Sequence, residues 1–357
     1  MKLKKYKKAI FEGIFLVVVF LLTVYGVFKG EDLGELMTVI KGTNKGFLSV
    51  GIVLVVLFIY SESMIIHYLM NSIGIKLRRD TCFLFSSVGF FFSCITPSAS
   101  GGQPMQIYFM KKKDIPIPIS TLVLMIITIT YKLVLVLVGI ALLLFGMSLI
   151  HTYMHGMEWV FYLGIFLNVV CVGLMLMLVL APQTATKLAQ STLNFLTKIK
   201  ILKYKPERIK KLNDSMEMYG QVANFLKSNV KIISNVMLIT IVQRFMLFAT
   251  TYFVYRAIGL KGVSAVVITL LQASISVAVD MLPLPGGMGI TEKLFSIVFL
   301  PIFGVKFLLP GMVLSRGISY YVQLLLSAVM TLVAKLTIGK NRLNNNCLLY
   351  TSDAADD

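Results

Sequence analysis

Charged residues are scarce in this sequence. Only 14% of the 357 residues are Asp, Glu, Lys or Arg, whereas 57% are hydrophobic, and the mean hydropathy is +0.85. A water-soluble core does not need so many apolar residues. The composition excludes a soluble globular enzyme and predicts a polytopic membrane protein, because about 20 apolar residues make one crossing of the bilayer.

Several motifs that carry chemistry are missing. The four cysteines form no CxxC pair, and three of them lie in apolar segments, where we interpret them as small buried hydrophobes. His151 and His155 have the spacing of a metal pair but no third ligand nearby, so we expect no metal and no cofactor. There is no G-x-x-x-x-G-K-[ST] phosphate loop, which argues against ATP hydrolysis within this chain.

Acidic residues are few in comparison with basic ones. Lys and Arg number 34 against 16 Asp and Glu, a formal charge of +18. In a soluble protein this excess would suggest a nucleic-acid partner, but here the charge gathers in the loops between apolar runs, as the positive-inside rule requires. We therefore expect membrane phospholipids, and not nucleic acid, as partners.

Apolar runs predict an all-α fold with six transmembrane helices and two interrupted segments. Pro removes a backbone donor and clashes with the preceding turn, so a segment with a central Gly/Pro cluster cannot be one continuous helix. The interrupted segments, about 81–110 and 263–305, contain Thr96-Pro-Ser-Ala-Ser-Gly-Gly-Gln-Pro104 and Pro283-Leu-Pro-Gly-Gly-Met-Gly289. The six spans are about 9–28, 47–70, 118–147, 158–181, 230–257 and 308–336.

Flanking charges predict the side of the membrane on which each segment begins. The segment 81–110 has cations at both ends, so we expect a re-entrant hairpin that begins and ends in the cytoplasm. The loop 148–157 has no Lys or Arg and reads as external, whereas 183–229 is strongly basic and reads as internal. With both termini cytoplasmic, the segment 263–305 becomes a re-entrant hairpin from the outside, although Arg256 and Lys261 then lie externally.

The resulting order predicts an inverted-topology repeat. We place the first repeat in residues 1–182 and the second in 158–340, which includes the span 158–181. A basic amphipathic linker, 183–229, joins them. Its apolar face suits either a helix on the anionic inner leaflet or a helix packed against the protein; this face comprises Ile209, Leu212, Met216, Tyr219, Val222 and Leu226.

The two ends of the sequence carry their own expectations. Five lysines precede the apolar run at the N-terminus, but no small-x-small cleavage site follows, so we expect an uncleaved first span. Residues 347–357 break abruptly from the basic, Asn-rich stretch before them, and we expect this tail to be non-native.

An inverted repeat places its substrate site near the midplane, where broken helices direct half-helix ends at the ligand. A helix N-terminus in low dielectric offers unpaired N–H groups to an anion. Pro104 suits the first turn of the helix after its glycines, and either Thr291 or Gly289 suits the cap of the later one. The backbone positions expected to form the site are Pro97, Gly101, Gly102, Gln103, Pro104, Pro285, Gly286, Gly287 and Gly289.

Ionisable residues within the spans are expensive in hydrocarbon and therefore mark a cavity or an ion pair. We expect Lys132, Arg244 and Arg316 to bind a lipid phosphate. Asp280 and Glu292 would pair these cations or bind an amine, and Tyr320 would line the same site. The alternative is a set of internal salt bridges that only fix helix packing, and Glu62 is the residue best suited to that role.

Three stretches resemble a known family. Thr96–Pro104, Leu284-Pro-Gly-Gly-Met-Gly-Ile-Thr-Glu292 and Leu314-Ser-Arg-Gly-Ile-Ser-Tyr-Tyr321 look like the lysylphosphatidylglycerol synthase transmembrane family, the flippase domain of the multiple peptide resistance factor and its stand-alone relatives. The resemblance covers roughly residues 5–340. This chain departs from the pattern at Gln103 and Gln106, where many relatives have an acidic residue and an Arg, so the headgroup stays open.

The resemblance implies a flippase of the bacterial plasma membrane that moves lysyl-phosphatidylglycerol or a related anionic or aminoacylated lipid between leaflets. A separate lipid-modifying synthase is an implied partner, because 357 residues leave no room for the soluble aminoacyl-transfer domain of fused relatives. The alternatives are a phosphatidylglycerol lysyltransferase-associated enzyme and a proton-coupled small-solute transporter. If transport is coupled to protons, Asp280 and Glu292 are the candidate proton carriers. If it is not coupled, the chain is a facilitator that lets lipids equilibrate between the leaflets. A second copy of this chain is a further possible partner, in a homo-oligomer.

Overall fold

The computed structural model describes residues 33–198 and 206–352 of the chain. All regular elements in these ranges are helical. The predicted span 9–28 lies outside the described residues, as do the last five residues of the expected non-native tail.

Four of the predicted spans are continuous helices. Each is long and apolar enough to cross a bilayer, and a kinked fifth candidate covers Pro285–Ile338. The Asn44 side chain caps the first of them by accepting from the backbone N–H groups of Gly46 and Phe47. The four helices are α3 (Lys45–Ser72), α6 (Ile117–Phe145), α8 (Glu158–Leu180) and α11 (Val230–Ala257), and the short helices α2 (Leu33–Lys41) and α7 (Met147–Tyr153) flank them.

Both interrupted segments are broken where Gly and Pro gather. In the first, α4 (Arg79–Ile95) leads through a 3₁₀ turn, η1 (Pro97–Ala99), into α5 (Gly102–Lys111). In the second, α12 (Ala265–Val279) leads through η2 (Pro285–Gly287) into α13 (Ile290–Arg316). In the first segment the two arms pack against each other along their length, and in the second α12 packs against α13, so both segments are helical hairpins.

Helix α13 is itself folded back at Gly304, which has a φ of 67°. Its two arms lie antiparallel, because Glu292 contacts Arg316 and Ser296 contacts Met312 across them. The second arm continues through a π-helical stretch, η3 (Gly317–Val322), into α14 (Gln323–Ser352). The predicted last span, 308–336, therefore begins in α13 and ends in α14.

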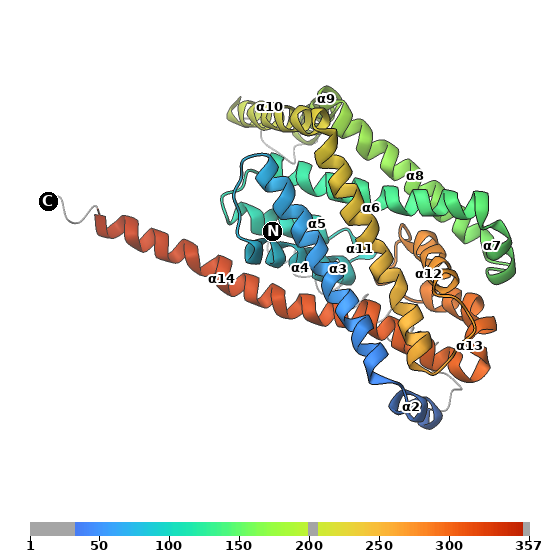
Figure 1. Ribbon diagram of the computed structural model, residues 1–357. Helices are drawn as coiled ribbons and strands as arrows, with labels where there is room; N and C mark the ends of the chain where they lie inside the picture. Colours follow the sequence, from blue (N-terminus) through green and yellow to red (C-terminus); the bar gives the residue numbers. More distant parts are fainter. Residues whose placement is uncertain (1–32, 199–205, 353–357) are drawn as a thin grey trace.

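The helices pack around the two breaks. Helix α3 lies along α11, and α4 packs between α3 and α14 (Figure 1). Helix α12 contacts α8 closely, since a Cβ on Gly164 would lie 2.3 Å from the carbonyl oxygen of Val277. The turns η1 and η2 touch each other. The tips of both hairpins thus meet inside the helical bundle.

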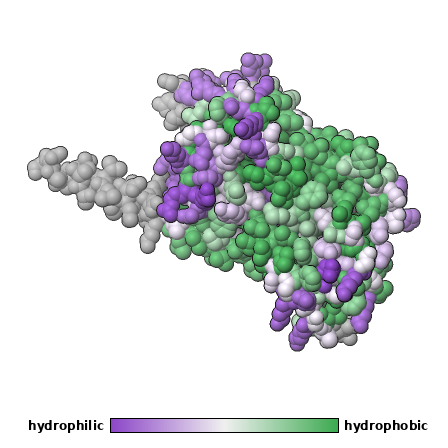
Figure 2. Space-filling model, in the orientation of Figure 1, coloured by the Kyte–Doolittle hydropathy of each residue, from purple (hydrophilic) through white to green (hydrophobic). Residues whose placement is uncertain are grey.

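The surface carries an apolar belt. Figure 2 shows hydrophobic side chains across the middle of the molecule and hydrophilic ones towards two opposite ends. Large apolar side chains remain exposed on the long helices, among them Phe145, Phe166 and Leu238. Such a belt is typical of a protein surrounded by lipid, because exposed apolar area on this scale is unfavourable in water.

The segment 183–229 forms two helices, α9 (Pro182–Lys198) and α10 (Pro206–Ser228). The apolar face of α10 packs against α6, where Tyr219 and Leu226 are buried. The Tyr219 hydroxyl donates to the Leu178 carbonyl oxygen at 3.2 Å. From Leu212 onwards this face packs against the protein, in agreement with the second of the two expectations for the linker; the Ile209 side chain lies outside the description.

Candidate functional site

A cavity of about 540 Å³ lies where the two hairpin tips meet. Its walls come from α3, α4, α5, α6, α8, α11 and α12, from the turns η1 and η2, and from the stretch that runs from α13 through η3 into α14. Most of its lining is apolar, with a few polar groups, as in sites for lipids and other small molecules. Eight predicted site residues line it: Lys132, Arg244, Asp280, Arg316, Tyr320, Gln103, Gly286 and Gly287.

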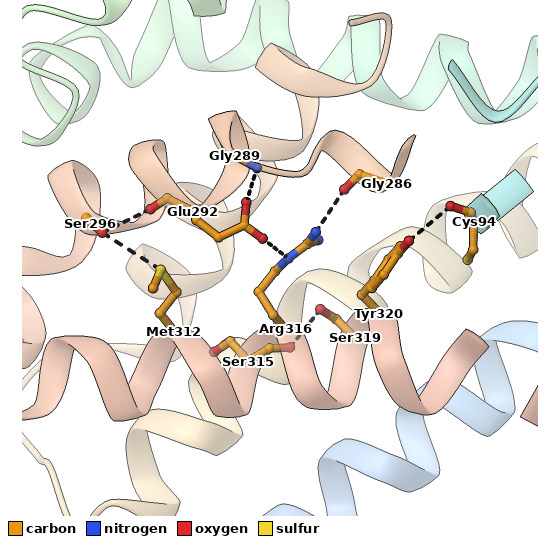
Figure 3. A network of polar contacts seen from close by, with 10 residues as sticks. All are labelled: Cys94, Gly286, Gly289, Glu292, Ser296, Met312, Ser315, Arg316, Ser319 and Tyr320. Carbon is orange, nitrogen blue, oxygen red and sulfur yellow. Dashed lines mark hydrogen bonds and ion pairs between the residues drawn. The ribbon is translucent and has the colours of Figure 1, made fainter. Parts of the chain in front are cut away.

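The second hairpin is held by a buried ion pair. Arg316 Nε donates to Glu292 Oε1 at 2.8 Å, and Arg316 Nη2 donates to the Gly286 carbonyl oxygen at 2.9 Å (Figure 3). The other carboxylate oxygen of Glu292 accepts from the Gly289 N–H at 2.6 Å. Gly289 is thus the N-cap of α13, and the carboxylate three residues later satisfies its N–H. This helix N-terminus is occupied by the protein's own anion.

A second ion pair joins α6 to the end of α12. Lys132 Nζ lies 2.7 Å from Asp280 Oδ2 and 2.9 Å from Met281 Sδ. Both charged side chains are nearly buried, at 12% and 10% exposure. In such surroundings each charge depends on the other, because removal of one partner leaves an uncompensated charge.

Arg244 is arranged differently from these two cations. Its side chain is 9% exposed, and its Nε atom has no hydrogen-bond partner. In the part of the chain that the structure describes, no carboxylate oxygen lies within 4.0 Å of its guanidinium. The guanidinium carbon instead lies 3.6 Å from the centre of the Tyr131 ring and 4.9 Å from that of Phe58. These cation–π contacts stabilise the charge and leave its N–H groups to the cavity.

The first hairpin is held by neutral groups. The Thr96 hydroxyl donates to the Phe92 carbonyl oxygen at 2.6 Å and accepts from the Gly101 N–H at 2.8 Å. Gly101 is the N-cap of α5, and Gly102 is its first residue. A Cβ on Gly102 would lie 2.1 Å from Ser93 Oγ and 2.7 Å from the Gly89 carbonyl oxygen, so only glycine permits this close approach of α4 and α5.

The two glutamines of the first hairpin connect it to neighbouring helices. Gln103 donates to the Thr128 hydroxyl of α6, and Gln106 Nε2 donates to Glu62 Oε1 of α3 at 3.0 Å. Gln106 packs against Gly89, where a Cβ would leave it no room. The Glu62 carboxylate is thereby held at the cavity wall, on the helix next to that of Arg244 and without a salt bridge to it.

Tyr320 bridges the two hairpins. Its hydroxyl donates to the Cys94 carbonyl oxygen, 3.0 Å away at the end of α4 (Figure 3). Its ring lies against Gly286, which has a φ of 57°, and a Cβ there would approach the ring to 2.3 Å. Glycine is needed at this position both for the left-handed backbone and for the space.

The predicted site residues fall into three groups. Lys132, Arg244, Asp280, Arg316 and Tyr320 line one cavity, whereas Glu292 lies behind Arg316 as its partner. Of the backbone positions, Gln103, Gly286 and Gly287 line the cavity. The others shape the two breaks without lining it: Pro97, Gly101, Gly102, Pro104, Pro285 and Gly289.

Sequence reasoning assigned Glu62 to helix packing and did not connect it to the cavity that it lines. Its presence inside an apolar run marked it as buried, but nothing local connects it to Gln106, 44 residues later, or to Arg244. The cavity also has hydroxyl groups from Thr128, Ser276 and Ser319 in its wall. Within the described residues, no three His, Cys, Asp or Glu side chains gather as a metal site would require.

Comparison with models of protein families identifies a match for this chain. A family model described as the lysylphosphatidylglycerol synthase TM region matches residues 10–327. None of the curated proteins compared with the chain matches it.

Proposed function

The chain belongs to the lysylphosphatidylglycerol synthase transmembrane family, and we propose that it moves a phospholipid headgroup between the leaflets of the bacterial plasma membrane. The observation that carries this proposal is the charged cavity between the tips of two broken hairpins. A polar headgroup needs such a path, because its charges are unfavourable in hydrocarbon.

The architecture supports an alternating-access mechanism. We propose that the two hairpins belong to inverted repeats, that they reach the midplane from opposite sides, and that both termini are cytoplasmic. The bridge from Tyr320 to Cys94 would then join one repeat to the other. Movement of one hairpin against the other would expose the cavity first to one leaflet and then to the other.

The topology is testable by labelling. Cysteine introduced at Lys112, after the first hairpin, should react with a membrane-impermeant thiol reagent only from the cytoplasm. Cysteine at His155, between α7 and α8, should react only from outside. Reaction of both from the same side would contradict the inverted arrangement.

The side chains proposed to bind the headgroup are Lys132, Arg244, Asp280, Glu292, Arg316 and Tyr320. Two of the three cations are already neutralised by carboxylates. These pairs would keep the cavity walls together, and they would open to the headgroup when it passes. Protonation of Asp280 or Glu292 would release its partner and so couple a proton to that step.

The function is tested by headgroup translocation of labelled phosphatidylglycerol and lysyl-phosphatidylglycerol in proteoliposomes. The intact chain should move at least one of them faster than empty vesicles do, and Arg244→Gln should abolish this movement. Arg256→Gln is the matched control, since Arg256 lies on the same helix, outside the cavity, and contacts Tyr252 and Phe47. If the folded protein moves neither lipid, soluble solutes become the substrates to examine.

A further inference from the structure

Most of the charged side chains that line the cavity are in ion pairs, but one cation and one anion are not. Lys132 is paired with Asp280, and Arg316 with Glu292, at salt-bridge distance. Among the described charged residues that line the cavity, Arg244 and Glu62 remain, one cation and one anion without a salt bridge between them. The cavity therefore offers two opposite charges, on the neighbouring helices α3 and α11, to an incoming ligand.

Arg244 has the features of an anion-binding residue. It is buried, its Nε is unpartnered, and its ring contacts with Tyr131 and Phe58 use none of its N–H donors. A buried guanidinium without a hydrogen-bonded anion is unfavourable, and a phosphodiester can accept two parallel N–H bonds from it. The position of Arg244 in the cavity wall makes those donors available.

Glu62 adds a second requirement, that the ligand should also carry a positive charge. It is 8% exposed, and one carboxylate oxygen is fixed by the Gln106 amide. A ligand that carried only negative charge would bring a like charge towards this carboxylate in a site of low dielectric. A ligand with an ammonium group beside its phosphate would complement both residues.

We infer that the cavity selects a zwitterionic headgroup, one phosphodiester held by Arg244 and one ammonium held by Glu62. This inference rests on the proposed function and narrows its substrate class. Gln106 is a positioning residue in this arrangement, since it acts by holding the Glu62 carboxylate. The negative charge of Glu62, which has no salt bridge, disfavours a purely anionic headgroup, and shape is not needed for this discrimination.

Binding to the purified full-length chain tests this directly and without transport. The probes are glycerophosphoethanolamine, which has one phosphodiester and one ammonium, glycerophosphoglycerol, which has the phosphodiester alone, and inorganic phosphate, which tests a free anion as the source of the charge. Titration calorimetry should give tighter binding of the first probe than of either other one, by roughly tenfold.

Two substitutions separate the charges. Glu62→Gln keeps a group that can bond to Gln106 but removes the negative charge, so the preference for the zwitterion should fall to about onefold or reverse. Arg244→Gln should abolish binding of both glycerophosphodiesters. Arg256→Gln should leave both affinities unchanged, and thermal unfolding should confirm that each variant is folded.

Several outcomes would overturn the inference. They are equal affinity of the intact chain for both headgroup analogues, binding of inorganic phosphate as tight as that of the zwitterion, or an unchanged preference in Glu62→Gln. If labelled lipids move in proteoliposomes without regard to headgroup, the inference fails and the proposed function stands. If the zwitterion binds but no lipid moves, the site stands and the proposed function fails.

Discussion

Neutral groups stabilise the break in the first hairpin, whereas a buried ion pair stabilises the break in the second. In the first, the Thr96 hydroxyl satisfies the Gly101 N–H at the start of α5. In the second, the Glu292 carboxylate satisfies the Gly289 N–H at the start of α13, and Arg316 binds both that carboxylate and the Gly286 carbonyl oxygen. The N–H group at the start of the second arm thus donates to a hydroxyl in the first hairpin and to a carboxylate in the second.

Because of this difference, we expect different substitutions to destabilise the two hairpins. The first depends on the absence of side chains, because Gly102 lies directly against Ser93 and Gly89. The second depends on two charges that are stable only together. We therefore expect the second hairpin, which also needs glycine at Gly286, to be the more sensitive to loss of a polar partner.

The largest effect should follow from Arg316→Ala. The substitution leaves the Glu292 carboxylate buried without its cation, so the protein should lose about 3–5 kcal/mol of stability. Thermal or chemical unfolding in detergent micelles measures this loss. Glu292→Gln should also destabilise, because one amide oxygen cannot accept from both Gly289 and Arg316, but less so, since Arg316 keeps its bond to the Gly286 carbonyl oxygen. The double variant Arg316→Ala/Glu292→Ala should recover part of the loss. Equal stability of Arg316→Ala and the intact chain would show that the ion pair does not hold the break.

A smaller effect is expected when volume is added to the first hairpin. Gly102→Ala places a methyl group where α4 and α5 touch, and overpacking of this kind costs about 1–3 kcal/mol. Gly173→Ala is the matched control, because a Cβ there meets nothing within 4 Å and alanine favours the helix. The same unfolding assay should give a loss for the first variant and none for the second. A loss of equal size in both would refute the close approach of the two helices.

The smallest effect should come from Thr96→Val, which removes a neutral cap. The Gly101 N–H loses its acceptor, and we expect a loss of about 1 kcal/mol, because the net contribution of a neutral hydrogen bond is of that order. Thr337→Val, which removes an exposed hydroxyl bonded only within α14, controls for the substitution itself. A loss in Thr96→Val as large as that in Arg316→Ala would remove the distinction between the two hairpins.

Much of the fold could be predicted because its signals are local. Long apolar runs and Gly/Pro clusters are read directly from neighbouring residues, and the structure places helices and breaks at these positions, such as Pro97 and Pro285. The predicted site residues were chosen one at a time by their charge within an apolar run, and Lys132, Arg244, Asp280, Arg316 and Tyr320 do line one cavity.

Pairing could not be predicted, because it depends on contacts between distant segments. Lys132 meets Asp280 across 148 positions, and Tyr320 meets Cys94 across 226. The choice of Gly289 over Thr291 as the cap of α13 likewise depends on Glu292, whose orientation is set by Arg316 in the opposite arm. Glu62 could not be connected to the cavity, because its partner Gln106 lies 44 positions later, on α5 of the first hairpin.

The central claim is that a lipid headgroup passes through the cavity between the two hairpin tips. Its most direct test introduces one cysteine, at Ser276 in the cavity wall, into a chain whose four native cysteines are replaced, and modifies it with a charged thiol reagent during translocation in proteoliposomes. We predict that modification at Ser276→Cys stops lipid movement, whereas the same modification at Met218→Cys, on the exposed side of α10, leaves it unchanged. Lipid movement that continues at the same rate after complete modification at Ser276→Cys would contradict the account.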